Sequence, residues 1–338
     1  MRYNPAANRW YRIAVTSGAL LAVLLLAVCY RYLESRGVFT AMKPVALACR
    51  SVSGVEGTSD IAVDAAAKTA FVAVAASTPS AQDGIYAYAF DTPGARLEKL
   101  AGTPRDFHPQ ALALTHPPGG DATLFTVNRR GTAYSIVVFR VTAANGAVRL
   151  EEKSSIGGRI LAEPSGIAPV DGDRFYLVNR HISRTALGRW LDDVLLLPRA
   201  NVLYFDGMIF REVAKRLNSP DGVTVSPDGG HLLVSEFYPR RIVSFVRNPF
   251  SGELKDAEVL PLPGGPGKLK TVADGSLIVA ATPKVRAREV LRVNLQDGVP
   301  QAAVPLYAGR SGEIYVAAEA GGRLLLGAGD GLRDCRLP

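Results

Sequence analysis

The chain has 338 residues, of which 48% are hydrophobic and 21% are charged, so it can bury a large core and is not a low-complexity disordered chain. Part of its formal charge of +8 comes from residues 1–41, which hold five arginines and one glutamate. The rest of the chain carries 34 basic and 30 acidic residues, without a basic run interleaved with aromatic residues. We therefore expect no nucleic-acid binding.

The first predicted element is an apolar helix at residues 13–32, interrupted only by Arg31. Its first 18 residues would span about 27 Å, close to the roughly 30 Å hydrocarbon core of a bilayer. Arginines at positions 2, 9 and 12 precede the helix, which by the positive-inside rule places the N-terminus in the cytoplasm.

The alternative for this segment is a cleaved signal peptide, but no Ala-x-Ala-like cleavage site follows the apolar run. We expect a cytoplasmic tip with a single-pass signal anchor at residues 1–41. The domain at residues 42–338 would then be exported to a periplasm or a lumen.

The three cysteines fit that placement. Cys29 lies inside the apolar run, whereas Cys49 and Cys335 bracket the exported domain almost from end to end. Spacing alone leaves two separate buried thiols as an equal alternative. Export to an oxidising compartment favours a disulfide between Cys49 and Cys335.

Six similar units follow, each with short apolar segments that alternate with period two and are separated by polar turns. This alternation is typical of strands with one buried face. A period of roughly 50 residues with several strands per unit is typical of propeller blades, and a β-sandwich would not need six similar units. We predict an all-β fold, a six-bladed β-propeller with units that begin near residues 60, 109, 164, 220, 266 and 312.

One segment in the third unit departs from the strand pattern. Residues 182–197 carry apolar side chains close to helical spacing, with Ser183 as a plausible start and Pro198 as the end. We predict an amphipathic helix inserted in blade three. It would either pack on the propeller or place its Leu and Trp side chains over the active site or in the surface of the membrane.

No common nucleophile, dinucleotide-binding or metalloprotease motif occurs. Candidate residues are therefore those in the loops that enter the inner strands, because these loops converge on the central channel. Oxygen ligands around such an axis suit Ca²⁺, although an Asp in a turn is more often a simple turn cap. The candidates are Asp60, His108, Gln110, Ser165, Asp221 and Glu313.

Several segments resemble the serum paraoxonase/arylesterase family, within the wider group of strictosidine synthase-like and gluconolactonase-like propellers. They are FHPQALAL at 107–114, VNRHIS at 178–183, SPDGVTVSPDG at 219–229 and GRLLLGAGDGLRDCRL at 322–337. The resemblance implies a six-bladed propeller that hydrolyses aryl esters or lactones with the help of calcium.

The resemblance also implies a set of metal ligands. Ser59 stands where the family has a Glu, and Ser165 and Asp221 stand at its two Asn positions. Asp60 matches a ligand of a second, structural calcium. Because several of these ligands are substituted, any calcium site should be weaker than in relatives.

The family's two active-site histidines correspond to Gln110 and Arg129, while His181 is retained. We expect a membrane-anchored hydrolase of small esters or lactones, with His108 or His181 in proton transfer. The alternative is a propeller without catalysis that binds a small ligand or a protein partner in its channel, with Arg129 recognising an anion.

Overall fold

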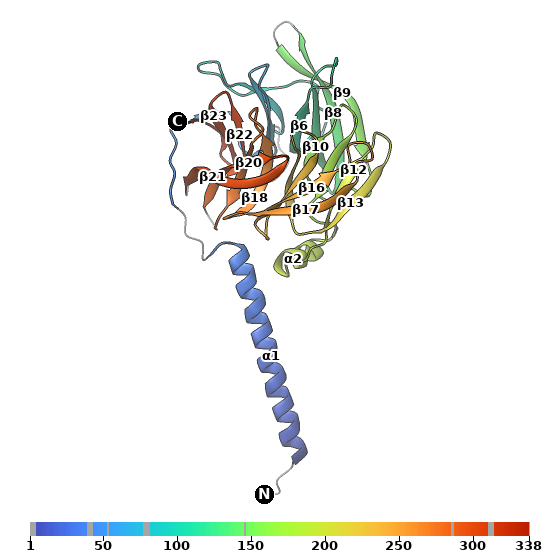
Figure 1. Cartoon of the computed structure of the whole chain (residues 1–338), viewed down its shortest axis with the longest axis vertical. Coiled ribbons are helices and arrows are strands. Elements are labelled where there is room, and N and C mark those ends of the chain that lie inside the picture. The colour runs from blue at the N-terminus through green and yellow to red at the C-terminus, as the bar shows by residue number, and fades with distance from the viewer. Residues whose placement is uncertain are drawn as a thin grey trace.

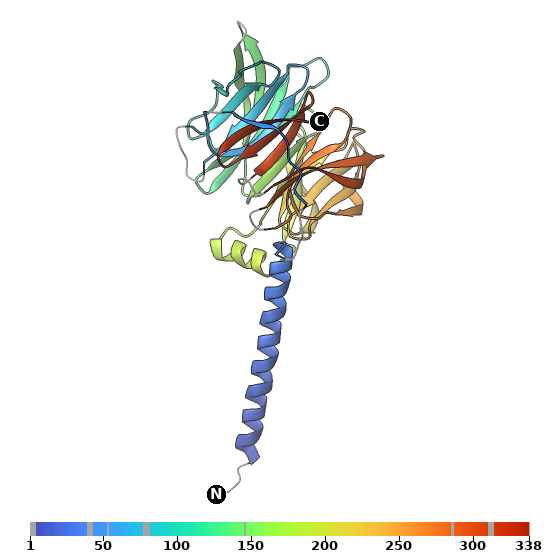
Figure 2. The same cartoon turned by 90° about the vertical axis from the view of Figure 1, so that its left-hand side faces the viewer.

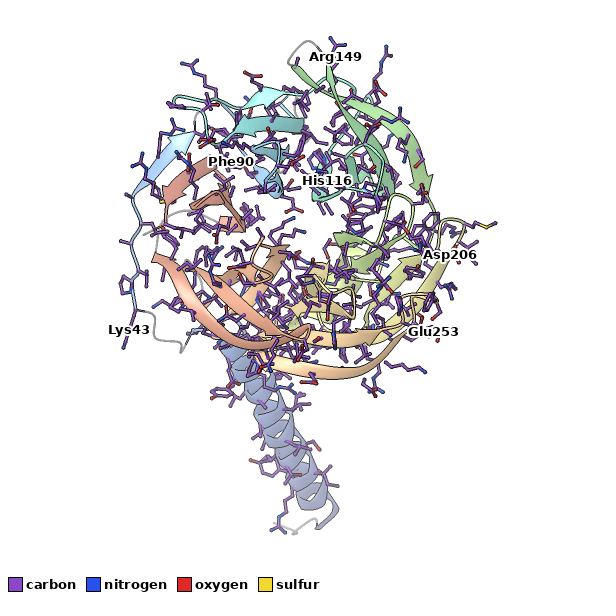
Figure 3. All side chains as sticks on the ribbon, turned by 45° about the horizontal axis from the view of Figure 1, so that its top comes forward. Lys43, Phe90, His116, Arg149, Asp206 and Glu253 are labelled. Carbon is purple, nitrogen blue, oxygen red and sulfur yellow. A yellow bond between two sulfur atoms is a disulfide. The ribbon has the colours of Figure 1, made fainter. Side chains whose placement is uncertain are left out.

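The computed structural model describes residues 5–38, 43–52, 54–76, 82–144, 147–284, 287–309 and 314–337. A long helix precedes a body of six four-stranded sheets (Figure 1). The sheets are arranged around a common axis as the blades of a propeller (Figure 3). The predicted six-bladed fold is confirmed, while the predicted boundary between residues 41 and 42 lies outside the described residues.

All neighbouring strands in the blades are antiparallel, and each blade runs from an inner strand at the axis to an outer strand at the rim. From the axis outward, blade one consists of β2 (Thr58–Asp64), β3 (Thr69–Val74), β4 (Gly84–Ala89) and β5 (Glu98–Lys99). Blade two consists of β6 (Pro109–Thr115), β7 (Thr123–Arg130), β8 (Ala133–Ala144) and β9 (Ala147–Gly157). Blade three consists of β10 (Pro164–Pro169), β11 (Phe175–Asn179), β12 (Ala200–Phe205) and β13 (Phe210–Leu217).

The remaining blades follow the same plan. Blade four consists of β14 (Pro220–Val225), β15 (His231–Glu236), β16 (Arg241–Arg247) and β17 (Leu254–Pro261). Blade five consists of β18 (Gly265–Thr271), β19 (Leu277–Thr282), β20 (Arg288–Gln296) and β21 (Val299–Gly309). Blade six consists of β22 (Ile314–Ala320), β23 (Arg323–Ala328), β24 (Gly331–Arg336) and the N-terminal β1 (Cys49–Val52).

The ring closes where β1 pairs with β24. Cys49 lies opposite Cys335 in this pairing, and the two form a disulfide across 286 residues. The predicted closure is confirmed. This pairing joins the N-terminal strand to the last blade and so holds the two ends of the row of blades together.

Apolar side chains between neighbouring blades form the core, as the period-two alternation predicts. Between blades two and three, for example, Phe175 packs against Phe125 and Phe205 with ring centroids 5.6 and 5.1 Å away. The expected Asp-Gly turns join inner strands to their neighbours, with Gly229 and Gly275 at positive φ of 73° and 85°. Glycine adopts that conformation without the steric cost of a side chain.

The N-terminal helix α1 (Pro5–Ser35) extends away from the propeller (Figure 1). The stretch Tyr11–Ser35 is long and apolar enough to cross a membrane, and its most apolar window of 18 residues has no buried residue. Its C-terminal end is held by Arg240, which donates from Nε to the carbonyl of Ser35 (3.4 Å) and from Nη2 to that of Pro283 (3.2 Å).

The second helix, α2 (Ala186–Val194), connects β11 to β12 in blade three. It is shorter than the predicted 182–197, because Thr185 and not Ser183 caps it. The Thr185 hydroxyl accepts from the Gly188 amide (3.1 Å), while Ser183 donates to Asp192 (2.7 Å). Figure 2 shows α2 beside the end of α1, at the end of the propeller where the inner strands begin.

Candidate active site

A β-bulge lies near the start of every inner strand. In β6, for example, the pairing skips from Pro109 to Ala111, and the other five inner strands show a shift at the same place. A bulge leaves a residue unpaired and redirects its side chain. The residues skipped in this way are Ser59, Gln110, Ser165, Asp221, Gly222, Gly267, Lys268 and Tyr315.

A cavity of about 490 Å³ lies at the mouth of the channel, on the side of α1. Five of the unpaired bulge residues line it: Ser59, Gln110, Asp221, Lys268 and Tyr315. The mouth cavity brings together predicted residues from different blades and adds the cations Arg180 and Lys268, which were not predicted. Its polar lining consists of Glu56, Thr58, Ser59, His108, Gln110, Arg129, Arg180, Asp221, Lys268 and Tyr315. The predicted Glu313 lies outside the described residues.

His108 forms a buried pair with Asp83, a residue that was not predicted. Its Nδ1 lies 2.5 Å from Asp83 Oδ2, and both side chains are 4% exposed. On the other side of the ring, Nε2 lies 3.1 Å from Nη2 of Arg129. A guanidinium can only donate, so Nε2 is the acceptor and Nδ1 carries the proton that is donated to Asp83. His108 is thus a neutral imidazole with its acceptor nitrogen on the side of Arg129.

His181 is placed differently, because it lies between two carboxylates. Its Nε2 is 2.9 Å from Asp193 Oδ1, and its Nδ1 is 3.3 Å from Glu163 Oε2. Burial alone would lower the pKa of His181, but hydrogen bonds to Asp193 and Glu163 raise it to about 9. His181 is therefore a cation at neutral pH, and it does not line the mouth cavity. This geometry favours His108 over His181 as the group that accepts a proton.

Asp221 lies between two cations. Its Oδ1 accepts from Nη2 of Arg180 (2.6 Å) and lies 3.5 Å from Nζ of Lys268. Burial alone would raise the pKa of Asp221, but Arg180 and Lys268 outweigh this effect and hold it below its usual value. The Asp221 carboxylate is therefore ionised and already paired.

Asp60 lies deeper in the channel and is 1% exposed. Its carboxylate accepts the amides of Ile61 (2.8 Å) and Leu112 (2.7 Å), and Nζ of Lys270 lies 2.7 Å away. The two predicted serine ligands also have partners. The hydroxyls of Ser59 and Ser165 donate to the carbonyls that begin the next inner strands, at Pro109 (2.7 Å) and Pro220 (2.9 Å).

This donor set does not fit a calcium ion. Calcium takes roughly six to eight oxygen ligands, several of them anionic. Here Asp60 and Asp221 face lysine and arginine groups in place of further carboxylates. Within the described residues, no three His, Cys, Asp or Glu side chains gather as a metal-binding group. The serine hydroxyls bond instead to carbonyls of the neighbouring blades.

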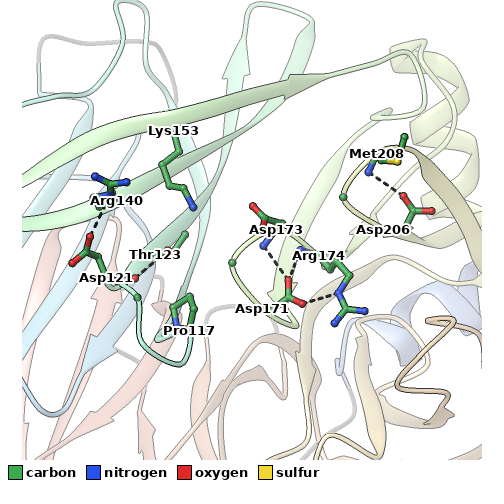
Figure 4. Close-up of a pocket in the computed structure, with 13 residues that line it drawn as sticks. Pro117, Asp121, Thr123, Arg140, Lys153, Asp171, Asp173, Arg174, Asp206 and Met208 are labelled. Carbon is green, nitrogen blue, oxygen red and sulfur yellow. Dashed lines mark hydrogen bonds and ion pairs between the residues drawn. The ribbon is translucent and has the colours of Figure 1, made fainter.

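A second large cavity, of about 670 Å³, lies at the opposite end of the propeller (Figure 4). Its walls are largely turns, and two of its carboxylates have partners close in sequence. Asp171 pairs with Arg174 (2.6 Å), and Asp206 accepts the amide of Met208 (3.0 Å). These contacts stabilise the turns, and the cavity contains no histidine among the described residues that line it. We therefore place the candidate site at the mouth cavity.

Asp83, Arg180, Lys268 and Lys270 were not predicted. Asp83 lies 25 residues before its partner in a loop, and no sequence signal marks the pair. The lysines do leave a signal: KLK at 268–270 puts two cations at period-two spacing on an inner strand, hence on one face.

The chain is similar in sequence and in fold to several known proteins. The family model for Arylesterase matches residues 90–304. Serum paraoxonase/arylesterase 2 from Homo sapiens is 25% identical over 240 residues, which are 66% of this chain and 65% of that protein. The match thus spans slightly less than two thirds of the relative.

Solved structures with a similar fold include a gluconolactonase from Xanthomonas campestris. It has a TM-score of 0.57 and 17% identity, with 88% of this chain and 96% of that chain covered. Regucalcin from Agrobacterium tumefaciens, described as a calcium-binding protein, has a TM-score of 0.51 and 15% identity over 86% and 93% of the two chains. These structures support the fold, and the family model covers more than half of the sequence: the chain belongs to the arylesterase family.

Proposed function

We propose that this protein hydrolyses carboxylic esters or lactones at the mouth cavity. The observation that supports this best is the buried Asp83–His108 pair. A histidine held by a carboxylate on one nitrogen and presenting a neutral acceptor on the other is suited to act as a general base. Membership of the arylesterase family points to the same class of reaction.

In this mechanism, the Arg129 guanidinium, which donates to Nε2 of His108 in the free protein, turns to the carbonyl oxygen of the substrate. The freed Nε2 takes a proton from a water molecule as the water oxygen attacks the carbonyl carbon. Asp83 holds the ring orientation and stabilises the imidazolium that forms. The imidazolium then returns the proton to the leaving alkoxide as the C–O bond breaks. Water and ester are consumed, and an acid and an alcohol are released. His108 ends the cycle as the neutral imidazole.

The cations of the mouth cavity would stabilise the negative charge that develops on the carbonyl oxygen. Arg129, Arg180 and Lys268 line the cavity with His108, against the carboxylates of Asp221 and Glu56. Positioned donors of this kind act where charge forms in the transition state. The excess of positive charge also favours substrates that carry an anionic group.

The test compares His108→Gln with His116→Gln in the full chain in detergent, with an aryl acetate and a δ-lactone as substrates. We expect His108→Gln to lower kcat by roughly 10²- to 10⁴-fold. His116 is a matched control, because it also pairs with a carboxylate (Asp64, 3.1 Å) but lies 53% exposed at the far end of the channel (Figure 3). Its substitution should leave kcat unchanged.

Equal activity of the two variants would contradict the role of His108. An absence of turnover with any ester or lactone, together with saturable binding of an anionic ligand that Arg129→Ala abolishes, would favour the binding propeller instead.

We also propose that α1 anchors the protein as a single-pass membrane helix, with the N-terminus in the cytoplasm and the propeller exported. The arginines before the apolar segment support this orientation. The mouth cavity, the end of α1 and α2 share one end of the propeller (Figure 2). On α2, Leu187 and Trp190 are 66% and 58% exposed, as expected of side chains that enter a membrane surface.

A Trp10→Phe variant leaves Trp190 as the single tryptophan and makes this surface contact measurable. In liposomes with brominated lipids, we expect the fluorescence of Trp190 to be quenched, whereas an aqueous quencher should have little effect. The reverse pattern would show that α2 lies in solvent. For the topology, a periplasmic reporter enzyme fused after residue 338 should be active, and an active cytoplasmic reporter there would reverse the assignment.

A further inference from the structure

We propose that Lys268 and Lys270 are built-in cations of the channel. Their ammonium groups hold the oxygen atoms that would otherwise gather around a metal ion, so that the protein folds and keeps its channel together without calcium. This inference is independent of the proposed reaction, except where the role of Lys268 in the mouth cavity is concerned.

Both lysines extend from β18 toward the axis and contact other inner strands. Lys270 Nζ lies 2.7 Å from Asp60 of β2 and donates to the carbonyl of Leu112 of β6 (3.0 Å). Lys268 Nζ donates to the carbonyl of Ser165 of β10 and lies 3.5 Å from Asp221 of β14. The two ammonium groups therefore link β18 to four of the other five inner strands.

The oxygen atoms around each lysine Nζ form a set that suits an ammonium group. Each set has one carboxylate and one main-chain carbonyl, and an ammonium has three N–H donors to share among such acceptors. Calcium would need several more ligands around it. The charges are also complementary, since Lys270 matches Asp60, while Lys268 and Arg180 together face the single carboxylate of Asp221.

The position of the two pairs explains why such cations are needed. Asp60 and Lys270 are both buried, with side chains 2% and 16% exposed. A buried carboxylate without a counter-charge is strongly destabilising. The starts of all inner strands meet at the axis of a propeller. Repulsion between charges there, or an unfilled space, would therefore weaken the contacts between the blades. A lysine side chain is part of the protein, so it supplies the counter-charge to the carboxylate at any concentration of free ions.

Lys268 has a second consequence, which depends on the proposed hydrolysis. It lines the mouth cavity, so its charge acts on a carbonyl oxygen bound there. Under this inference, the lysine supplies permanently the positive charge that a bound cation would bring.

The first experiment measures calcium directly on the full chain in detergent. We expect no heat of Ca²⁺ binding in calorimetry, and the same melting temperature with EDTA as with millimolar Ca²⁺. Anything that binds only the folded state would raise that temperature. A stoichiometric calcium site, or a melting temperature that falls in EDTA and recovers with Ca²⁺, would overturn the inference.

The second experiment compares Lys270→Met with Lys255→Met, a lysine on the exposed outer strand β17. Methionine keeps most of the length of lysine but removes the charge. We expect the melting temperature to fall by several degrees in Lys270→Met and to stay unchanged in Lys255→Met. Equal melting temperatures would show that Lys270 is not needed as a cation. If Lys270→Met does not fold, the calcium measurements on the unmodified chain still decide the question.

The stability measurements also separate this inference from the proposed reaction. A chain that hydrolyses no ester but is indifferent to EDTA would refute the reaction and keep the built-in cations. Turnover that requires added Ca²⁺ would refute the role of Lys268, even if the melting temperature did not change.

Discussion

The two ends of the propeller use the same residue types in different ways. At the end away from α1, the turn carboxylates of Asp171 and Asp206 bind groups close in sequence, as in the Asp171–Arg174 pair three residues apart, and the pair of Asp64 with His116 between blades is half exposed. At the mouth, the Asp221 carboxylate binds Arg180 and Lys268, which are 41 and 47 residues away. Local pairs shape turns, whereas buried pairs between blades bring charge to the axis. The buried pairs between blades therefore mark the candidate site.

The disulfide closes the whole ring, so the stability lost without it is the reference for changes made at one end of the propeller. Cys49→Ser should lower stability most, because the chain-entropy model gives roughly 5–6 kcal/mol for a loop of 286 residues. Thermal unfolding of the full chain with and without reductant measures the loss. Cys29→Ser, which removes the free exposed cysteine, is the control and should have no effect. An unchanged melting temperature under strong reduction would show that the pairing of β1 with β24 closes the ring alone.

The contrast between the ends can be tested by removing one carboxylate from each. Asp221→Ala leaves Arg180 and Lys268 without their shared partner, so we expect a loss of about 3 kcal/mol. Asp206→Ala removes a side chain that accepts two turn amides, from Met208 and Ile209, and should cost about 1 kcal/mol, as for a lost helix cap. Urea unfolding measures the free energy of unfolding of both variants. Equal losses would show that carboxylates at the two ends contribute equally to stability.

A further expected effect is a pH dependence from His181. The folded state raises the pKa of His181 from its ordinary value of 6.5 to about 9, through Asp193 and Glu163. A raised pKa means that the folded state binds the proton more tightly, so the stabilisation is complete below pH 6.5 and is lost as the pH rises through 9. Urea unfolding across this range should show the decline. His181→Gln should flatten it, and an unchanged slope in that variant would assign the decline to another group.

Local features of the fold could be predicted from the sequence. The apolar segment at 13–32 predicts α1, and the alternating segments predict the strands, because side-chain period reports which face is buried. The predicted helix at 182–197 was too long at both ends, since Ile182 precedes the first helical turn and three leucines, residues 195–197, follow the last one. The Ser183 hydroxyl donates to Asp192, and the Thr185 hydroxyl caps the helix in its place.

The candidate site was only partly predictable. The structure places Gln110, Asp221 and His108 at the mouth, as expected, because the starts of inner strands converge there in any propeller. The partner of His108 was not predictable, since Asp83 comes from a loop of a different blade. The expectation that His181 could accept protons depended on its ordinary pKa, which Asp193 and Glu163 change in the folded protein.

By itself, the sequence determined the apolar helix and the number of blades, because each depends on composition or on spacing along the chain. The pairing of Cys49 with Cys335 was favoured only through the expected export, since spacing left separate thiols as an equal alternative. Only the tertiary structure decided which charges meet on the axis. Lys270 contacts Leu112 across 158 residues, and Lys268 contacts Ser165 across 103. Closure of the ring creates these contacts by bringing the inner strands together, and the same closure excludes water from Asp60 and makes a counter-charge necessary there.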